Sequence, residues 1–159
     1  MRVTTRVRYG LRAMMQIAEA YPGGPVSISA ISRHQSISGK YLEQLVGCLR
    51  RHALIGSRKG VRGGYYLTRP PAEISLWEVI SALDGETDLV ECVGRPELCE
   101  RSQNCCTRVV WASLGTRLRD FWGTFSIQDL LDYLPEGCDS LLPCARAQPT
   151  AASAANPAH

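Results

Sequence analysis

Residues 28–67 read ISAISRHQSISGKYLEQLVGCLRRHALIGSRKGVRGGYYL, and they contain two helical patterns followed by a hairpin pattern. The first helix is expected over 28–35, capped by Ser27 or Ser29. After a short break, a second is expected from about residue 40 to 52, because its apolar residues fall at helical spacing: Tyr41, Leu42, Leu45, Val46 and Leu49. Two helices joined by a tight turn predict a helix-turn-helix.

The segment LIGSRKGVRGGYYLT, at 54–68, predicts a β-hairpin directly after these helices. LIGS and GYYLT are short β-favouring runs, and the basic, glycine-rich SRKGVRG suits the hairpin tip. A hairpin in this place makes the helix-turn-helix the winged variant.

Further helices flank this unit. Thr5 is expected to cap a helix that runs to about Tyr21. Ser75 and Glu78 form the pattern of a capping box for a short helix closed by Gly85.

A long helix is expected from Thr107 onward, and the Ser126/Asp129 pair predicts the cap of one last short helix. The long helix carries a narrow apolar stripe: Val110, Trp111, Leu114, Leu118, Phe121, Trp122 and Phe125. A helix with one such stripe needs a partner surface, either its own domain or a second copy of the chain.

The net charge of +3 is unevenly divided. Residues 1–69 hold twelve Lys and Arg against Glu19 and Glu43, a balance of +10, and the remainder of the chain balances at −7. A concentrated basic half favours a polyanionic partner, although a solvated basic surface is the alternative.

Several classes of protein are disfavoured by what the sequence lacks. It has neither a membrane-spanning run nor a signal-peptide core, so we expect a cytoplasmic protein without a membrane partner. It also has no paired carboxylates, Ser–His arrangement or phosphate-cradling loop, so we expect neither an enzyme nor a small-molecule substrate.

The second helix of a helix-turn-helix presents its N-terminal residues to base edges in the major groove of DNA. Here the candidates are Ser38, Lys40, Tyr41, Glu43 and Gln44. Glu43 is the only acid between Glu19 and Glu73, and Glu can accept from cytosine as Gln can pair with adenine; a plain surface helix former is the alternative. The wing cations Arg58, Lys59 and Arg62 can reach a minor groove or its phosphates.

Three spaced cysteines form the second candidate site. Six residues separate Cys92 from Cys99 and five separate Cys99 from Cys105, unlike the tight pairs of zinc ribbons. Wider loops suit an iron–sulfur cluster, although incidental free thiols are the alternative. Cys106 adjoins Cys105, so the two side chains diverge in most backbones and Cys106 is only an additional candidate.

In these features the sequence resembles the IscR family. Its members are bacterial winged-helix regulators that bind DNA as homodimers and sense iron–sulfur status or redox stress. The resemblance covers about residues 1–134 and rests on MRVTTRVRYGLRAM, YLEQL, RGGYYL, ISLWEVISALDG, the spaced cysteines and TRVVW. It implies that Cys92, Cys99 and Cys105 hold a cluster. It also implies that residues 107–125 pair with their mate across a two-fold axis.

One departure concerns the last cluster ligand. The family has a histidine three residues after the third cysteine, and here that position is Arg108, which stays protonated and cannot ligate. The related regulators NsrR and RirA use three cysteines with a ligand from elsewhere, and some hold a 4Fe-4S cluster. We expect 2Fe-2S, with 4Fe-4S as the alternative. The missing ligand would be Cys106, Glu91, Glu100 or a group of the partner subunit.

The expected fold class is mainly α with a small β-wing: a winged helix-turn-helix domain plus a long dimerisation helix. The expected units are the DNA-binding domain 1–84, a cluster-binding loop 85–106, the dimerisation and short C-terminal helices 107–134, and a disordered tail 135–159. The expected function is a homodimeric regulator whose operator binding is controlled by a cluster that senses iron–sulfur, redox or nitric oxide status. The alternatives are a zinc-bound or metal-free thiol-sensing DNA-binding regulator, or a small iron–sulfur electron carrier.

Overall fold

The computed structural model describes residues 3–85 and 88–133 of the 159-residue chain. In these ranges the protein is mostly helical, and it has one two-stranded sheet. Its longer elements are α1 (Thr5–Glu19), α2 (Ile28–Gln35), α3 (Gly39–Arg51), β1 (Ile55–Arg58), β2 (Gly64–Leu67), α4 (Leu76–Asp84), α6 (Cys106–Gly123) and α7 (Ile127–Asp132). Shorter helical turns are η1 (Pro71–Glu73), α5 (Glu91–Gly94), η2 (Pro96–Leu98) and η3 (Ser102–Asn104).

Serine and threonine caps explain where most of the helices begin. Ser27 caps α2 and Ser38 caps α3, each by accepting a hydrogen bond from a backbone N–H of the first turn. The capping boxes expected at the starts of α4 and α7 are both present. The expected cap of the first helix is wrong by one residue, because the backbone of Thr4 is extended and its hydroxyl accepts from the N–H of Val7.

The wing is an antiparallel hairpin in which Ile55 pairs with Leu67 and Arg58 with Gly64. It is anchored to the α1–α2 connection by two backbone hydrogen bonds between Val26 and Tyr65, of 2.8 and 2.9 Å. The two backbones come so close that a Cβ atom at Gly64 would overlap the carbonyl of Val26. The hairpin is therefore packed against the helices of the N-terminal unit and is an integral part of its fold.

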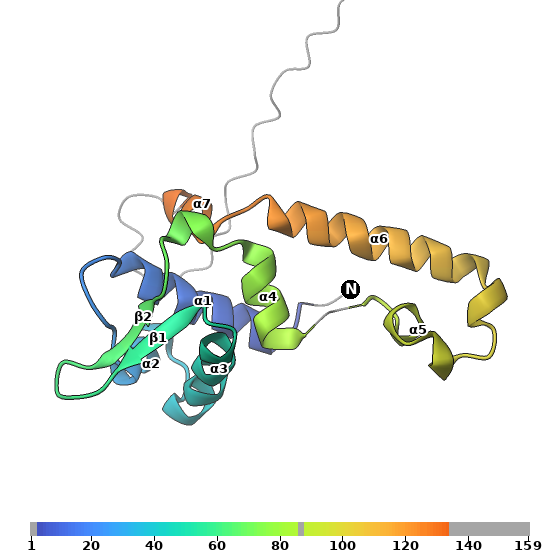
Figure 1. Cartoon of the computed structure of the whole chain (residues 1–159). Helices are drawn as coiled ribbons and strands as arrows, with labels where there is room; N and C mark the ends of the chain where they lie inside the picture. Colours follow the sequence, from blue (N-terminus) through green and yellow to red (C-terminus); the bar gives the residue numbers. More distant parts are fainter. Residues whose placement is uncertain (1–2, 86–87, 134–159) are drawn as a thin grey trace, which may run out of the picture.

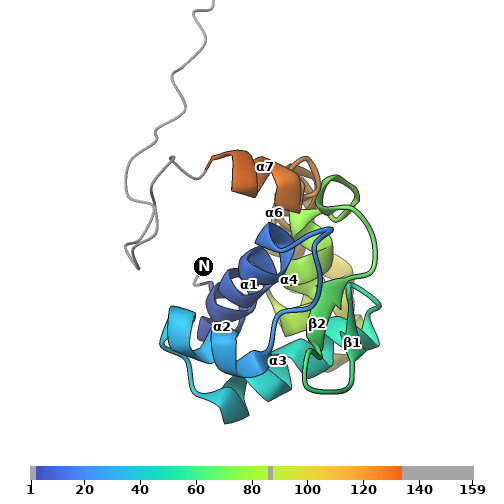
Figure 2. The ribbon, with the colours of Figure 1, turned by 90° about the vertical axis from the view of Figure 1, so that its left-hand side faces the viewer.

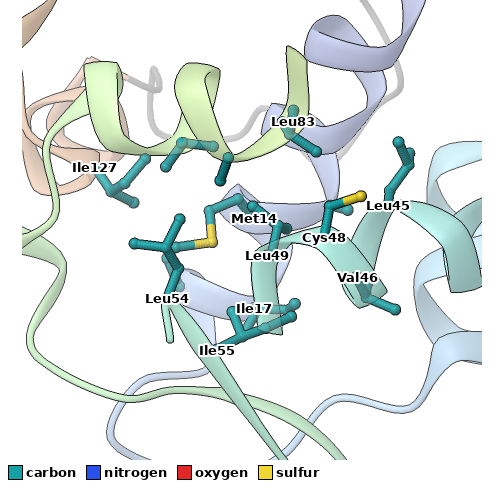
Figure 3. Close-up of a cluster of buried hydrophobic side chains, with 14 of the residues drawn as sticks. Met14, Ile17, Leu45, Val46, Cys48, Leu49, Leu54, Ile55, Leu83 and Ile127 are labelled. Atoms are coloured by element: carbon teal, nitrogen blue, oxygen red, sulfur yellow. The ribbon is translucent and has the colours of Figure 1, made fainter. Parts of the chain in front are cut away.

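The hydrophobic core lies inside the helix-turn-helix unit, between α1, α3, α4 and the first strand. Figure 3 shows Met14 and Ile17 of α1 facing Leu49 of α3, with Leu83 of α4 above them. The first residue of α7, Ile127, is also fully buried in this core. The short last helix is thereby tied to the N-terminal unit, although it follows the long helix in the sequence.

The long helix α6 extends away from this unit, and α5 lies beside its far end (Figure 1). The stretch between Gly85 and Cys106, expected to be a loop, forms three short helical turns where it is described. Runs of three or four residues have no periodicity that sequence could reveal. The expected division into four units stays a prediction, and the expected tail 135–159 lies outside the described residues.

Within the described ranges, no helix is both long and apolar enough to cross a membrane.

Candidate nucleic-acid interface and cysteine segment

Helix α3 has one buried face and one exposed face. Leu42, Leu45, Val46 and Leu49 are buried in the core. Lys40, Glu43 and Gln44 are exposed, and their spacing of three and four residues puts them side by side on one face. In the described part of the chain Glu43 takes part in no salt bridge, so its carboxylate is available to a partner.

The other two residues expected at this surface also have roles inside the protein. Ser38 is exposed, and its Oγ accepts from the N–H of Tyr41 over 3.3 Å as the N-cap of α3. Tyr41 is half-buried, and its ring packs edge-on against Tyr9 with centroids 6.2 Å apart. These contacts orient the N-terminal end of α3 relative to α1.

Arg58, Lys59 and Arg62, the three cations expected on the wing, are all exposed. The wing and α3 lie along the same edge of the molecule (Figure 2). Arg50 near the end of α3 reaches the hydroxyl of Ser57 in β1, at 3.5 Å. The structure thus places the exposed face of α3 and the basic hairpin tip on one surface, which we call the basic edge. It consists of Lys40, Glu43, Gln44, Arg58, Lys59 and Arg62.

Cys48 forms contacts that the sequence did not predict. It is 3% exposed and belongs to the hydrophobic core, yet guanidinium groups of Arg6 and Arg51 lie 2.8 and 3.0 Å from its sulfur. The three side chains join the start of α1 to the end of α3. No pattern in the sequence links residues 6 and 48.

The cysteine segment, by which we mean residues 91–105, folds against the start of α6. Cys92 lies in α5, Cys99 directly follows η2, and Cys105 is the N-cap residue of α6. These three thiols are free and half-buried, and Cys106, the first residue of α6, is free and exposed. The expected ligands are therefore on one short, compact stretch of chain.

Arg108 fastens this stretch to the long helix. Its Nε donates to the carbonyl oxygen of Cys92 over 2.8 Å, and its Nη2 donates to that of Val93 over 3.4 Å. Both carbonyls belong to the last turn of α5, where helix carbonyls lack partners of their own. Arg108, at the position where the sequence resemblance implies a histidine, thus holds the turn of Cys92 in place.

The thiolate form is more stable at Cys105 than at an ordinary cysteine. The pKa of this thiol lies below its ordinary value, first because the hydroxyl of Thr107, 3.1 Å away, donates to the sulfur. The backbone N–H of Arg108 and the charge of Arg101 act in the same direction. Thiolate is the form of cysteine that binds metals.

The donor chemistry of the segment fits an iron–sulfur cluster, because such clusters are held by cysteine thiolates. The arrangement is not a closed metal site, however. Among the described residues, no three His, Cys, Asp or Glu side chains are placed so that they could hold one metal ion.

None of the residues of α6 is buried, although the helix carries many apolar side chains. Five of these are strongly exposed: Val109, Val110, Trp111, Leu114 and Phe121. Leu118 and Trp122, from the expected stripe, are half-buried. Val109 was not part of that stripe, so we call its four exposed members, Val110, Trp111, Leu114 and Phe121, the apolar flank of α6.

The other end of α6 is joined to the winged unit by aromatic packing. Trp122 stacks on Trp77 of α4 with centroids 6.0 Å apart and an interplanar angle of 12°. The guanidinium of Arg119 covers the Trp77 ring at 5.4 Å. Helix α6 therefore connects the cysteine segment at its start to α4 at its end.

Comparison with known proteins agrees with this arrangement. The family model Rrf2, described as an iron-dependent transcriptional regulator, matches residues 3–133. The transcriptional regulator IscR of Xenorhabdus nematophila is 40% identical over 131 residues, which are 82% of this chain and 79% of that protein.

Two solved structures are also similar. CymR, the global cysteine regulator of B. subtilis, matches with a TM-score of 0.69 at 30% identity, over 84% of this chain and 98% of that one. IscR of T. potens matches with a TM-score of 0.67 at 30% identity, over 83% and 87%. The resemblance expected from the sequence and the winged-helix fold class are both confirmed.

Proposed function

The chain belongs to the Rrf2 family of iron-dependent transcriptional regulators, and on that premise we propose that it is a homodimer whose operator binding is controlled by an iron–sulfur cluster. DNA binding and transcriptional regulation follow from the family itself. The dimer, the cluster and the roles of individual residues are the finer parts of the proposal.

On the basic edge, α3 enters the major groove and the wing lies over the adjacent minor groove. Glu43 accepts from the amino group of cytosine, and Gln44 pairs with adenine, each contact discriminating by roughly 1–3 kcal/mol. Lys40 and the wing cations bind phosphates, which sets affinity more than sequence preference. Support comes from the exposure of these side chains on one surface.

The homodimer forms through the apolar flank of α6. Four large apolar side chains exposed along one stripe of a helix are more than a monomeric soluble protein is expected to leave in water. Pairing with the same helix of a second copy across a two-fold axis covers them, because a two-fold interface brings identical patches together. It also presents two recognition helices to a palindromic operator.

Cys92, Cys99 and Cys105 hold the cluster. When bound, an iron–sulfur cluster supplies strong bonds to all three thiolates and a centre that oxidants can destroy. Arg108 keeps the turn of Cys92 beside α6, and the hydroxyl of Thr107 together with the N–H of Arg108 lowers the pKa of Cys105, which favours the thiolate that binds a metal. Candidates for a further ligand remain Cys106, Glu91, Glu100 or a group of the partner subunit.

Control of DNA binding operates through α6. Ordering of the cysteine segment against the start of this helix favours one orientation of the helix, and the Trp77–Trp122 stack passes that orientation to α4 and the winged unit. A coupling free energy of about 1–3 kcal/mol changes operator affinity roughly 5- to 150-fold.

The observation that carries this proposal is that one helix begins at the cysteine segment and ends against α4. The test is visible absorption with iron and sulfide quantitation on protein purified without oxygen. We expect coloured protein that contains both elements, and loss of the colour in Cys92→Ala, Cys99→Ala and Cys105→Ala. Cys48→Ala is the matched control and keeps the colour, since Cys48 lies in the core. Full colour in all three variants contradicts the ligand assignment.

A second candidate is a thiol-sensing regulator that binds zinc or no metal. It is favoured by the hydrogen bonds that lower the pKa of Cys105, because the thiolate is the form of cysteine that acts as nucleophile and metal ligand. Colourless protein that contains zinc, or no metal, and still binds DNA supports this candidate over the cluster.

A further inference from the structure

The tip of the wing is a tight turn with a defined geometry. The N–H of Gly63 donates to the carbonyl of Gly60 over 2.9 Å, which closes a four-residue turn with Val61 and Arg62 at its centre. A Cβ atom at Gly63 would overlap the carbonyl oxygens of Arg58 and Gly60, so the turn requires glycine there. The hairpin therefore holds Val61 and Arg62 as its outermost pair.

Val61 is an unusual residue for this position. It is fully exposed, more so than any other large hydrophobic side chain of the described residues. Turns favour Gly, Pro, Asn, Asp and Ser, and a branched aliphatic side chain contributes nothing to the fold when it contacts only water. A local rule broken without a structural benefit points to a role in binding.

The charges around Val61 indicate what it meets. Arg58, Lys59 and Arg62 are exposed within three residues of it, and no acidic residue lies in the sequence between Glu43 and Glu73. Such a tip attracts a polyanion and repels a basic surface. Proteins that bind the minor groove combine such cations with apolar side chains that contact the groove or wedge between base steps.

We infer that Val61 is a specificity-determining residue that contacts the floor of the DNA minor groove and favours A·T over G·C pairs beneath the wing. The reason is steric and chemical: guanine adds an amino group to the minor-groove floor, and A·T pairs do not. A methyl-bearing side chain cannot accept a hydrogen bond from that amino group and cannot occupy its space. Arg62 contributes attraction to the phosphates beside it.

This inference rests on the proposed docking of the wing, and its test uses inosine to separate the two grooves. An inosine·cytosine pair has the major-groove edge of G·C but lacks the minor-groove amino group. An operator is first selected from a random duplex pool with wild-type protein. The wing position is then located as the base pairs whose hydroxyl-radical protection is lost in Arg62→Ala.

Operators with A·T, I·C or G·C at that position are then compared by fluorescence anisotropy. Wild-type protein is expected to bind the A·T and I·C forms within about twofold of each other and the G·C form about 5- to 30-fold more weakly. In Val61→Ala the G·C penalty falls to about twofold, while the salt dependence of binding is unchanged. In Arg62→Ala the log–log salt slope falls by about 0.9.

A penalty against G·C that persists undiminished in Val61→Ala overturns the inference, as does equal wild-type binding to all three forms. Either result leaves the proposed function intact. Failure of wild-type protein to bind any selected duplex contradicts the proposed function itself. Val61→Ala is expected to unfold at the wild-type temperature, since the side chain makes no core contact.

Discussion

Arg108 ties the turn that contains Cys92 to the long helix, through a hydrogen bond of 2.8 Å from its Nε to the Cys92 carbonyl oxygen. The two residues are sixteen positions apart, and the bond joins α5 to the first turns of α6. Arg108 cannot bind iron itself, but it positions Cys92, which we propose as an iron ligand. The cysteine segment is consequently held against α6 by a side chain of the helix itself.

Replacing Arg108 should loosen that attachment. In metal-free protein, Arg108→Met is expected to speed amide hydrogen exchange at residues 93–95 roughly tenfold, because a hydrogen bond to a charged group contributes about 1.5–3 kcal/mol and part of this is screened at a half-buried site. Arg117→Met, on the exposed side of α6, is the matched control and should leave exchange unchanged. Equal exchange rates in both variants would show that Arg108 does not hold the turn of Cys92 against α6.

Glu43 and Lys40 lie on the same exposed face of α3, but we expect their substitutions to change DNA binding in different ways. Glu43→Ala is expected to change which operators are preferred, by roughly 1–3 kcal/mol at one base pair, with little effect on binding to random DNA. Lys40→Ala is expected to weaken binding evenly and to lower the log–log salt slope by about 0.9. Selection from a random duplex pool and salt titrations measure the two effects. An even loss in Glu43→Ala on every sequence would rule out base reading.

The apolar flank of α6 predicts an oligomeric state. Leu114→Arg is expected to give monomers by analytical ultracentrifugation, since it buries a charge in the proposed interface, and to weaken operator binding at least tenfold. Thr116→Arg, also exposed on α6 but outside the apolar flank, is the control and should remain dimeric. A Leu114→Arg protein that sediments as wild type contradicts the proposed dimer.

Glu78 should give stability a measurable pH dependence. Burial alone would raise the pKa of Glu78, but hydrogen bonds from Arg69 and Ser75 hold it below its ordinary value of 4.5. The carboxylate therefore stabilises the fold above pH 4.5, and this contribution is lost as the pH falls through the lowered pKa.

At pH 7, Glu78→Gln is expected to cost less than about 1 kcal/mol, because both partners are more than a third exposed and glutamine keeps the bond to Ser75. Glu78→Ala should cost about 1–2 kcal/mol through loss of the capping box. Urea unfolding at pH 7 and pH 4 measures both. The Gln variant should approach wild type at the lower pH, and a constant gap would contradict the assigned ion pair.

Features that depend on neighbouring residues were predictable from the sequence. The Ser75–Glu78 and Ser126–Asp129 boxes lie within four residues, and both appear as expected. The two helices and the hairpin of residues 28–67 follow from helical spacing and glycine placement. The choice between Thr4 and Thr5 as the N-cap of α1 was not predictable. It depends on which of these two adjacent residues has extended backbone dihedral angles.

Features that depend on distant contacts were not predictable. The Trp77–Trp122 stack joins residues forty-five positions apart, and the Arg6–Cys48 contact joins residues forty-two apart. The helical turns around Cys92 and Cys99 are too short to carry a periodic signal, and the first of them forms beside a helix whose Arg108 donates to its carbonyl oxygens. The candidate ligands were found as a pattern of thiols, whereas their attachment to α6 required the structure.

In the proposed mechanism, the state of the cysteine segment controls DNA binding. Its most direct test is the dissociation constant for one selected operator fragment, measured without oxygen on reconstituted protein and on the same preparation after removal of its iron. We expect the two dissociation constants to differ by about 5- to 150-fold. Values that agree within twofold, on protein shown to have contained iron and sulfide, would contradict it.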